Sequence, residues 1–370
     1  MSEATFLEKL LDGAEVEWVA LGEVVKIKHG KNWKKLNSGN IPVYGSGGIM
    51  GHVDTYSCNK PTVLIPRKGS ITNIFYVESP LWNVDTIFYT EIDNNTLTPK
   101  YFYHFMKTVD LLSLDTGSGR PSLTQTILNK IQIPIPCPDN PEESLAIQAE
   151  IVRILDTFTE LTAELTAELT ARKKQYDYYR DQLLTFKDGE VEWKTLGEVY
   201  KFQYGMGNTI PTLGGEYPIY GSNGIVGAHN EFNSEDSPVI GHIGAYAGIV
   251  NWGKGKHFVT YNGVICRLIS ERVSSKYAYY QLLKQDFNSM AKSASHPFVS
   301  YAELNKVLIP IPSPSEQVRI VAILDQFDTL THSISEGLPR EIDLRQKQYE
   351  YYRDLLLNFP KPEPQTEGVA

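Results

Sequence analysis

The sequence predicts an α+β protein in which two related α/β globular domains are separated by two long helices. Three observations predict this class: the chain is duplicated, each copy begins with short strand-like runs, and each copy ends in a long amphipathic segment. At 370 residues the chain has room for two or three domains. We expect the copies to be related by a pseudo-two-fold axis, with antiparallel helices that form a coiled coil.

The duplication can be read directly from the sequence. VEWVALGEV at residues 16–24 returns as VEWKTLGEV at residues 191–199, an offset of 175 residues. The tetrapeptide IPIP occurs at 133–136 and again at 309–312, an offset of 176. KQYDYYRD at residues 174–181 returns as KQYEYYRD at residues 347–354. Agreement of this extent predicts two copies of one structural unit.

The first part of each copy is rich in β-branched and aromatic residues interrupted by Gly and Pro. Residues 62–65, 74–77 and 86–89 are typical of strands, and residues 99–114 of a helix. LEKLLDG at residues 7–13 resembles the segment that precedes residue 191, so the chain begins with the end of a helix. We therefore predict an N-terminal helix completing the repeat (1–15), two globular domains (16–138 and 191–313), a central helical spacer (139–190), a C-terminal helical spacer (314–359) and a flexible tail (360–370).

The second part of each copy is a long helix. Ser313-Pro314-Ser315-Glu316 predicts a capping box with Pro at the first helical position. The first helix begins at Asn140-Pro141 or at Ser144. Apolar residues in both helices follow a heptad pattern, which is typical of a coiled coil. The alternative is that each helix packs on its own domain, but the apolar stripe is too long for a domain of this size to cover.

Charged residues are distributed unevenly along the chain. The net charge is −9, yet residues 16–136 carry twelve basic against nine acidic side chains, while residues 139–190 carry six against twelve. Phosphate attraction depends on local patches, so the globular parts can still face nucleic acid. Three scattered cysteines and the lack of a signal peptide or membrane span predict a cytoplasmic protein without disulfides.

Residues 161–170 contain tandem TAEL tetrapeptides. With the duplicated layout, the IPIP strands and the repeated QY(D/E)YYRD, the chain resembles the specificity subunits of type I restriction–modification systems, in the subclass with tetrapeptide repeats in the central helix. The resemblance covers nearly the whole chain and is most specific in the helices.

The resemblance implies that each globular domain is a target-recognition domain that reads one half of a bipartite, asymmetric site in double-stranded DNA. The helices would set the spacer and dock two methyltransferase subunits and the motor–nuclease subunits. DNA methylation and cleavage would then reside in those partners, and we expect no catalytic site, no cofactor and no membrane association in this chain.

Helix geometry gives the tetrapeptide a physical meaning. Four residues lengthen a helix by ~6 Å and rotate its continuation by ~40°, while B-DNA turns by roughly 34–36° per base pair. One TAEL unit would therefore shift a domain along and around the duplex nearly in phase with the groove. From Ser313 to Tyr349 the second helix is four residues longer than the matching stretch of the first, and Gly and Pro near residue 337 should bend it there.

Differences between the two copies suggest the residues that read DNA. At an offset of 176, PRKGS at residues 66–70 is matched with HIGAY at 242–246, and GSGRP at 117–121 with SASHP at 293–297. A basic cluster lies at residues 28–35. The DNA-binding candidates are Lys31, Trp33, Lys34, Lys35, Arg67, Lys68, Arg120, His242, Tyr246, Lys254, Lys256 and His296. Ordinary solvated surface turns remain the alternative for each.

The candidates for the spacer and for subunit docking lie in the helices: Thr162, Leu165, Leu169, Tyr176, Tyr179, Tyr349 and Tyr352. Gly248 to Lys254 matches the P-loop pattern, but Gly255 replaces the Ser or Thr that would bind magnesium, so we reject it. No methylase motif or metal-ligand spacing is present. The alternatives are a duplicated ligand-binding or structural protein on a coiled-coil stalk, and a self-contained methylase.

Overall fold

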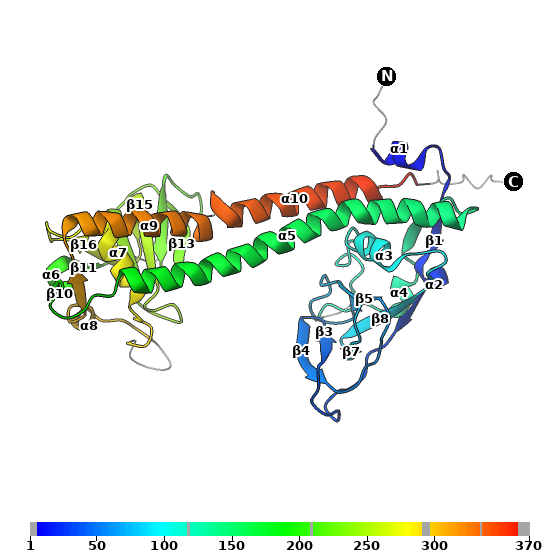
Figure 1. Ribbon diagram of the computed structural model, residues 1–370, viewed down its shortest axis with the longest axis horizontal. Helices are drawn as coiled ribbons and strands as arrows, with labels where there is room; N and C mark the ends of the chain where they lie inside the picture. Colours follow the sequence, from blue (N-terminus) through cyan, green and yellow to red (C-terminus); the bar gives the residue numbers. More distant parts are fainter. Residues whose placement is uncertain (1–5, 117–118, 208–209, 291–296, 334, 362–370) are drawn as a thin grey trace, which may run out of the picture. The chain divides into compact units, whose positions relative to one another are not determined.

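The computed structural model describes residues 6–116, 119–207, 210–290, 297–333 and 335–361 (Figure 1). The chain divides into two compact units. Unit 1 consists of residues 1–164 and 342–370, and unit 2 of residues 165–341. Because the boundary falls inside the longest helix, α5 (Pro141–Leu183), each unit owns part of it.

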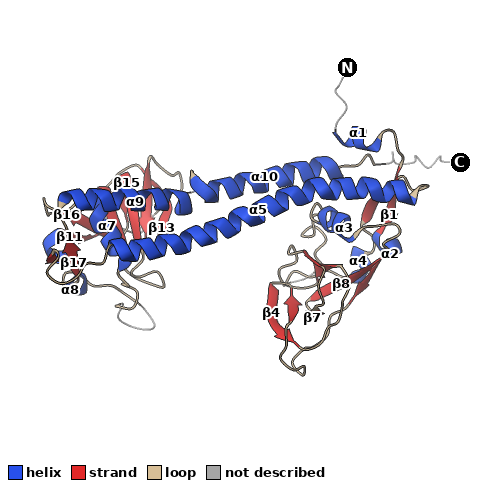
Figure 2. Cartoon of the chain, in the orientation of Figure 1, coloured by secondary structure: helices blue, strands red, loops and turns tan. Residues whose placement is uncertain are grey.

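Unit 1 combines three small sheets with helices (Figure 2). Its elements are α1 (Phe6–Leu11), β1 (Val16–Ala20), α2 (Leu21–Val24), β2 (Val25–Lys28), β3 (Ile41–Gly45), β4 (Gly48–Val53), β5 (Thr62–Pro66), β6 (Phe75–Val77), β7 (Trp82–Asn83), β8 (Ile87–Ile92), α3 (Pro99–Met106), α4 (Gln125–Leu128), β9 (Gln132–Pro136), the first part of α5 and most of α10 (Gly337–Leu357). The strands are ordered β2-β8-β5-β6, β4-β3-β7 and β1-β9. The three predicted strands are confirmed, and a short helix, α1, lies within the predicted N-terminal segment 1–15.

The helix expected over residues 99–114 is wrong in its length, since α3 ends at Met106. The reason is local. The Asp110 carboxylate accepts hydrogen bonds from the backbone N–H groups of Leu112 and Ser113, and these replace helical bonds with a turn.

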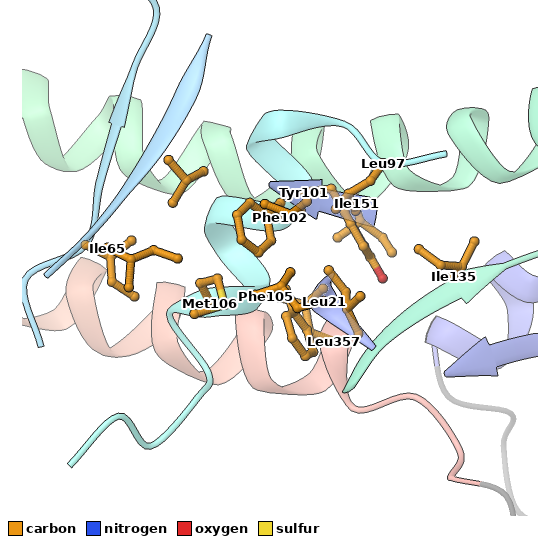
Figure 3. Packing of buried hydrophobic residues seen from close by; sticks show 14 of the residues in the cluster. Leu21, Ile65, Leu97, Tyr101, Phe102, Phe105, Met106, Ile135, Ile151 and Leu357 are labelled. Carbon is orange, nitrogen blue, oxygen red and sulfur yellow. The ribbon is translucent and has the colours of Figure 1, made fainter. Parts of the chain in front are cut away.

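The core of unit 1 joins the sheets to the helices (Figure 3). Tyr101 and Phe102 of α3, Ile151 of α5 and Leu357 of α10 all lie in this apolar cluster. Tyr101 is fully buried, and its hydroxyl donates to the Pro134 carbonyl at 2.8 Å, so the buried polar group is satisfied. The sheets of unit 1 and its helical segments therefore share one hydrophobic core.

Unit 2 repeats this plan with a larger sheet. Its elements are β10 (Glu192–Thr195), α6 (Leu196–Val199), β11 (Tyr200–Tyr204), β12 (Tyr217–Gly221), β13 (Gly224–His229), β14 (Ser234–Gly241), β15 (Val250–Val259), β16 (Gly263–Leu268), α7 (Ser275–Lys284), α8 (Tyr301–Leu304), β17 (Leu308–Ile311), α9 (Pro314–His332) and the second part of α5. The six-stranded sheet is ordered β11-β16-β14-β15-β12-β13. Tyr277 donates to the Pro310 carbonyl at 2.9 Å, as Tyr101 does to Pro134 in unit 1. The α+β fold class with two related domains is thus confirmed.

Within each unit, part of α5 packs against a C-terminal helix. In unit 1 the rings of Phe158 and Tyr352 stack with centroids 5.0 Å apart, and in unit 2 those of Phe327 and Tyr179 stack at 5.7 Å. These are the same two positions of the repeat with the helices exchanged. A coiled coil along the full length of the helices stays a prediction.

The C-terminal helix is broken rather than continuous. α9 ends at His332 and α10 begins at Gly337, so the single helix expected over residues 314–359 is wrong, while the predicted disturbance near residue 337 is confirmed. Gly337 has φ of 74°, and a Cβ there would lie 2.4 Å from the Thr329 carbonyl oxygen. Only glycine fits this close approach without strain.

Two helix starts can be compared with their predictions. α5 begins at Pro141, the earlier of its two candidate positions. Ser313 caps α9 by accepting from the Glu316 N–H at 3.3 Å. The Glu316 carboxylate pairs with Arg319 at 2.6 Å, and no return bond to Ser313 accompanies it in the described structure, so the capping box is only half formed.

Candidate nucleic-acid interface

In unit 1 several loops converge on Thr86, which precedes β8. Its carbonyl oxygen accepts from the N–H groups of Arg67 and Lys68 at 2.8 and 3.2 Å. Its hydroxyl accepts from the Ser46 N–H at 3.3 Å. The Asn73 amide in turn donates to the Ser46 carbonyl at 3.1 Å. Loops that are far apart in sequence are therefore held in one cluster by hydrogen bonds to the backbone.

The loop that carries Arg120 joins the same cluster. The Gly69 N–H donates to the Pro121 carbonyl at 3.0 Å, and Lys68 forms an isolated bridge with Ser122. Gly69 has φ of 84°, a left-handed conformation that favours glycine. Arg120 and Lys68 are exposed beside each other's loops, so two predicted cations share one surface.

Arg67 is half-buried, and its guanidinium is oriented by the protein. Nη1 donates to the Asp85 carbonyl at 3.3 Å. Arginine has five N–H donors, so one such bond fixes the side chain and leaves donors for a base edge or a phosphate. This is the geometry that a pre-oriented reading residue needs.

The predicted basic cluster at residues 28–35 lies next to the Thr86 loop cluster. The Lys31 N–H donates to the Asn83 carbonyl, and the Trp82 indole donates to the Lys31 carbonyl at 3.0 Å. A cavity of about 550 Å³ lies between this loop and the Thr86 cluster, lined by Asn32, Trp33, Lys34, Met50, Val84, Asp85 and Thr86. The Trp33 ring lies against Gly51, where a Cβ would come within 2.9 Å of it. Trp33 is therefore half-buried support, while Lys34 and Lys35 are exposed.

Unit 2 has an equivalent loop cluster, but its residues align with those of unit 1 at a different sequence offset. The His242 N–H donates to the Asn262 carbonyl at 2.8 Å, and the Gly244 N–H donates to the Pro297 carbonyl at 2.9 Å. These bonds match those of Arg67 and Gly69, so this loop has an offset of 175. The matching of residues 66–70 with 242–246 is wrong by one residue, because the strand before the loop is itself shifted. His242 therefore corresponds to Arg67.

His242 is buried, unlike its counterpart. Its ring lies 4.3 Å from that of Tyr204, and Nδ1 is 3.0 Å from the Val299 carbonyl oxygen. The exposed groups of this cluster are instead Tyr246 and Tyr261, which are 51% and 47% exposed. The sequence analysis did not select Tyr261. It corresponds to Asp85 of the first copy at an offset of 176, so the comparison of the two copies could have identified it.

The other candidates of unit 2 lie elsewhere. Lys254 and Lys256 project from β15, in its middle, and not from the loop that carries Tyr246. The Lys256 ammonium sits 4.6 Å from the centroid of the Phe232 ring. His296 lies outside the described residues. Lys254 stands in a strand, which agrees with rejecting a P-loop.

The scaffold candidates divide by exposure. Tyr176 and Tyr349 are buried, and burial raises the pKa of both phenols. Tyr179 and Tyr352 are about two-fifths exposed, whereas their neighbours Tyr178 and Tyr351, which the heptad pattern does not single out, are 61% and 64% exposed. Thr162, Leu165 and Leu169 are half-buried along α5. A pair of exposed tyrosines thus recurs at equivalent places in the two units.

The described residues offer neither a metal site nor a membrane span. No group of three or more His, Cys, Asp or Glu side chains stands where it could hold a metal ion within the described ranges. Nor is any described helix both long and apolar enough to cross a bilayer.

The chain thus belongs to a class of proteins with two related α+β domains, each of which carries an exposed loop cluster and packs on long helices. The chain belongs to the family of type I restriction–modification specificity subunits: the sequence model described as "Type I restriction modification DNA specificity domain" matches residues 14–172 and 189–344.

Relatives across the full length agree with this assignment. The chain is 40% identical to the EcoR124I/EcoR124II specificity subunit of Escherichia coli, covering 98% of this chain and 99% of that protein. It is 37% identical to the EcoprrI specificity subunit of Escherichia coli, over 91% and 93% of the two chains.

Two solved structures share the fold. The S subunit of the type I restriction–modification system from M. genitalium gives a TM-score of 0.64 at 18% identity, covering 95% of this chain and 98% of that one. A chain from a study of complex assembly and conformational transition of the type I R-M system gives 0.57 at 15% identity, covering 92% and 97%.

Proposed function

We propose that this chain is the DNA-reading subunit of a type I restriction–modification complex, and that each unit contacts one half of a bipartite, asymmetric duplex site. The observation that carries the proposal is the recurrence of one loop cluster in both units with different exposed side chains. The backbone bonds of Arg67 and His242 are alike, yet Arg67 and Tyr246 present different chemistry. A shared frame with variable side chains suits readers of two different half-sites.

The exposed groups of unit 1 suit a duplex surface. Arginine can bond guanine in the major groove through two donors, and lysines neutralise phosphates. We assign base reading to Arg67, and phosphate contacts to Lys31, Lys34, Lys35, Lys68 and Arg120. In unit 2 we assign reading contacts to Tyr246 and Tyr261, with His242 holding Tyr204 and Tyr261 in place through ring contacts.

The helices, on this proposal, do not read DNA. α5 and the C-terminal helices set the unread spacer and dock two methyltransferase subunits, which the motor–nuclease subunits join. On this proposal the recognition domains end at residues 138 and 313, and the TAEL units at 162–169 support a spacer that depends on the number of tetrapeptides. The chain then supplies specificity, and methylation and cleavage belong to its partners.

A binding experiment tests the proposal. The chain, assembled with the methyltransferase subunits of its restriction–modification system, is expected to methylate one bipartite sequence, identified by sequencing the methylated bases of a host genome. A duplex with this sequence should bind far more tightly than one with both half-sites scrambled, and more weakly as salt rises. Equal affinity for both duplexes would contradict the proposal.

A further inference from the structure

A partly buried polar cluster joins the first domain to both helices of its scaffold. Asp156 of α5 accepts a hydrogen bond from the Lys100 ammonium at 2.6 Å, and its other oxygen lies 3.0 Å from Nε2 of His104. Nδ1 of His104 lies 3.0 Å from the hydroxyl of Tyr349, on α10. His104 is 1% exposed. One side chain of α3 therefore bonds to α5 and to α10 at once.

The negative charge of Asp156 is stabilised by its hydrogen-bond partners, His104 and Lys100. Burial acts to raise the pKa of Asp156, but the hydrogen bonds from His104 and Lys100 outweigh it and hold the pKa below its usual value. An ionised Asp156 needs a donor, so His104 donates from Nε2 and its Nδ1 can accept from Tyr349. Charge-assisted bonds of this kind fix direction as well as distance.

Unit 2 has a similar cluster at three of the four equivalent positions. Asp325 of α9 accepts from the Tyr280 hydroxyl and lies 3.4 Å from the Lys276 ammonium. Lys276 and Tyr280 of α7 are thus counterparts of Lys100 and His104. The two units keep the acid and the lysine but exchange histidine for tyrosine. In both units the domain helix therefore presents two hydrogen-bond donors to one scaffold carboxylate.

A second polar contact holds the start of α3 on α5. The Gln148 side chain of α5 accepts from the Thr98 N–H at 2.9 Å, just before α3 begins. Beyond the Asp156 cluster the domain and α5 are parted by a cleft of about 720 Å³, lined by Glu78, Ser79, Thr159, Glu160 and others. Lys100, His104 and Asp156 themselves line this cleft, so the cluster lies at the edge of the contact between the domain and α5.

We propose that Lys100, His104, Asp156 and Tyr349 are positioning residues that set the angle of the first recognition domain on its scaffold, and so the spacing of DNA half-sites that the complex accepts. The inference rests on the proposed function. Without the cluster, the Gln148 bond and the apolar core that α3 shares with α5 and α10 still hold the domain on its scaffold, but the directional bonds that fix its angle at this edge are lost. Each half-site would still be read, but the distance between them would be less strictly defined.

The test compares spacing with affinity. The chain in complex with its methyltransferase subunits is titrated with four duplexes: the full site, the same site with its spacer one base pair longer or shorter, and the unit 1 half-site alone. The variants are His104→Phe and Tyr349→Phe. His104→Tyr serves as the matched comparison, because it restores the donor to Asp156 that unit 2 uses at this place but not the bond to Tyr349.

We expect His104→Phe to lose about tenfold in preference for the correct spacer, because rigid linkage raises the effective concentration of the second half-site. Tyr349→Phe and His104→Tyr each lose only the bond between these two positions, so both should show the same smaller loss. Half-site affinity should stay within about twofold in all three variants. Unchanged preference in both Phe variants would overturn the inference, as would equal losses on all four duplexes. If His104→Phe does not fold, Tyr349→Phe alone decides. A wild-type complex that ignored sequence altogether would instead refute the proposed function, and this inference with it.

Discussion

Replacing Arg67 by alanine tests whether the loop cluster reads bases. One guanidinium N–H is held by the Asp85 carbonyl at 3.3 Å, so two further donors can reach O6 and N7 of a guanine. A bidentate contact of this kind is worth about 1–3 kcal/mol of discrimination, or roughly 5- to 150-fold between bases. We expect Arg67→Ala to relax the preference at one base pair of one half-site by this factor. Sequencing of methylated sites in cells, with competition binding of single-base duplex variants, measures it.

A phosphate contact by Arg67 would give a different result from a base contact. If Arg67 contacts only phosphate, the variant will bind every duplex more weakly to the same extent, and the salt dependence will fall by about one counterion. Uniform weakening without any change of base preference would refute the assignment. Lys60→Ala is the matched control, since Lys60 is an exposed cation that precedes β5 while Arg67 comes directly after it. It should leave both affinity and preference unchanged.

The helices and the buried core allow three further tests. Deleting residues 166–169, one TAEL unit, should shorten the accepted spacer by about one to two base pairs without altering either half-site, because ~6 Å of helix and ~40° of rotation match about two and one base pairs. A changed half-site in the methylated sequences would contradict the spacer role. Tyr101→Phe should lower the free energy of unfolding by about 1–3 kcal/mol, because the buried Pro134 carbonyl loses its donor; thermal or denaturant unfolding measures this, and an unchanged midpoint would count against it. Alanine at both Tyr178 and Tyr351 should weaken binding of methyltransferase subunits but not the stability of the chain, and calorimetric titration that shows unaltered affinity would remove these tyrosines from the docking surface.

The duplication made most of the fold predictable. Two copies of one pattern identify strands and helices twice, so the strands at 62–65 and 86–89 and the helix after Ser313 could be placed from sequence. Boundaries were less secure where side chains compete with the backbone. Asp110 ends α3 early through a local turn, and Gly337 interrupts the C-terminal helix because another carbonyl approaches it. Both effects depend on single atoms that periodicity does not represent.

The candidate site was predictable in its loops but not in its side chains. The comparison of copies correctly led to the segments around Arg67 and His242, but a one-residue shift in the preceding strand altered which residues correspond. Burial could not be inferred either. His242 carries a polar ring that could face solvent, yet packing against Tyr204 encloses it and leaves Tyr246 and Tyr261 outside. Polarity alone therefore overstates how many residues can reach DNA.

The two loop clusters differ in a way that bears on asymmetry. In unit 1 the exposed groups around the cluster include Lys34, Lys68 and Arg120, whereas in unit 2 they include Tyr246 and Tyr261. Cations gain affinity from phosphates and lose it in salt, while aromatic rings gain it from apolar contact with bases and sugars and are less sensitive to salt. If each cluster grips its own half-site, raising the salt concentration should weaken the unit 1 half-site more than the unit 2 half-site. Footprints of the two halves at rising salt would then fade in a fixed order, and simultaneous loss would show that this difference in side chains does not govern affinity.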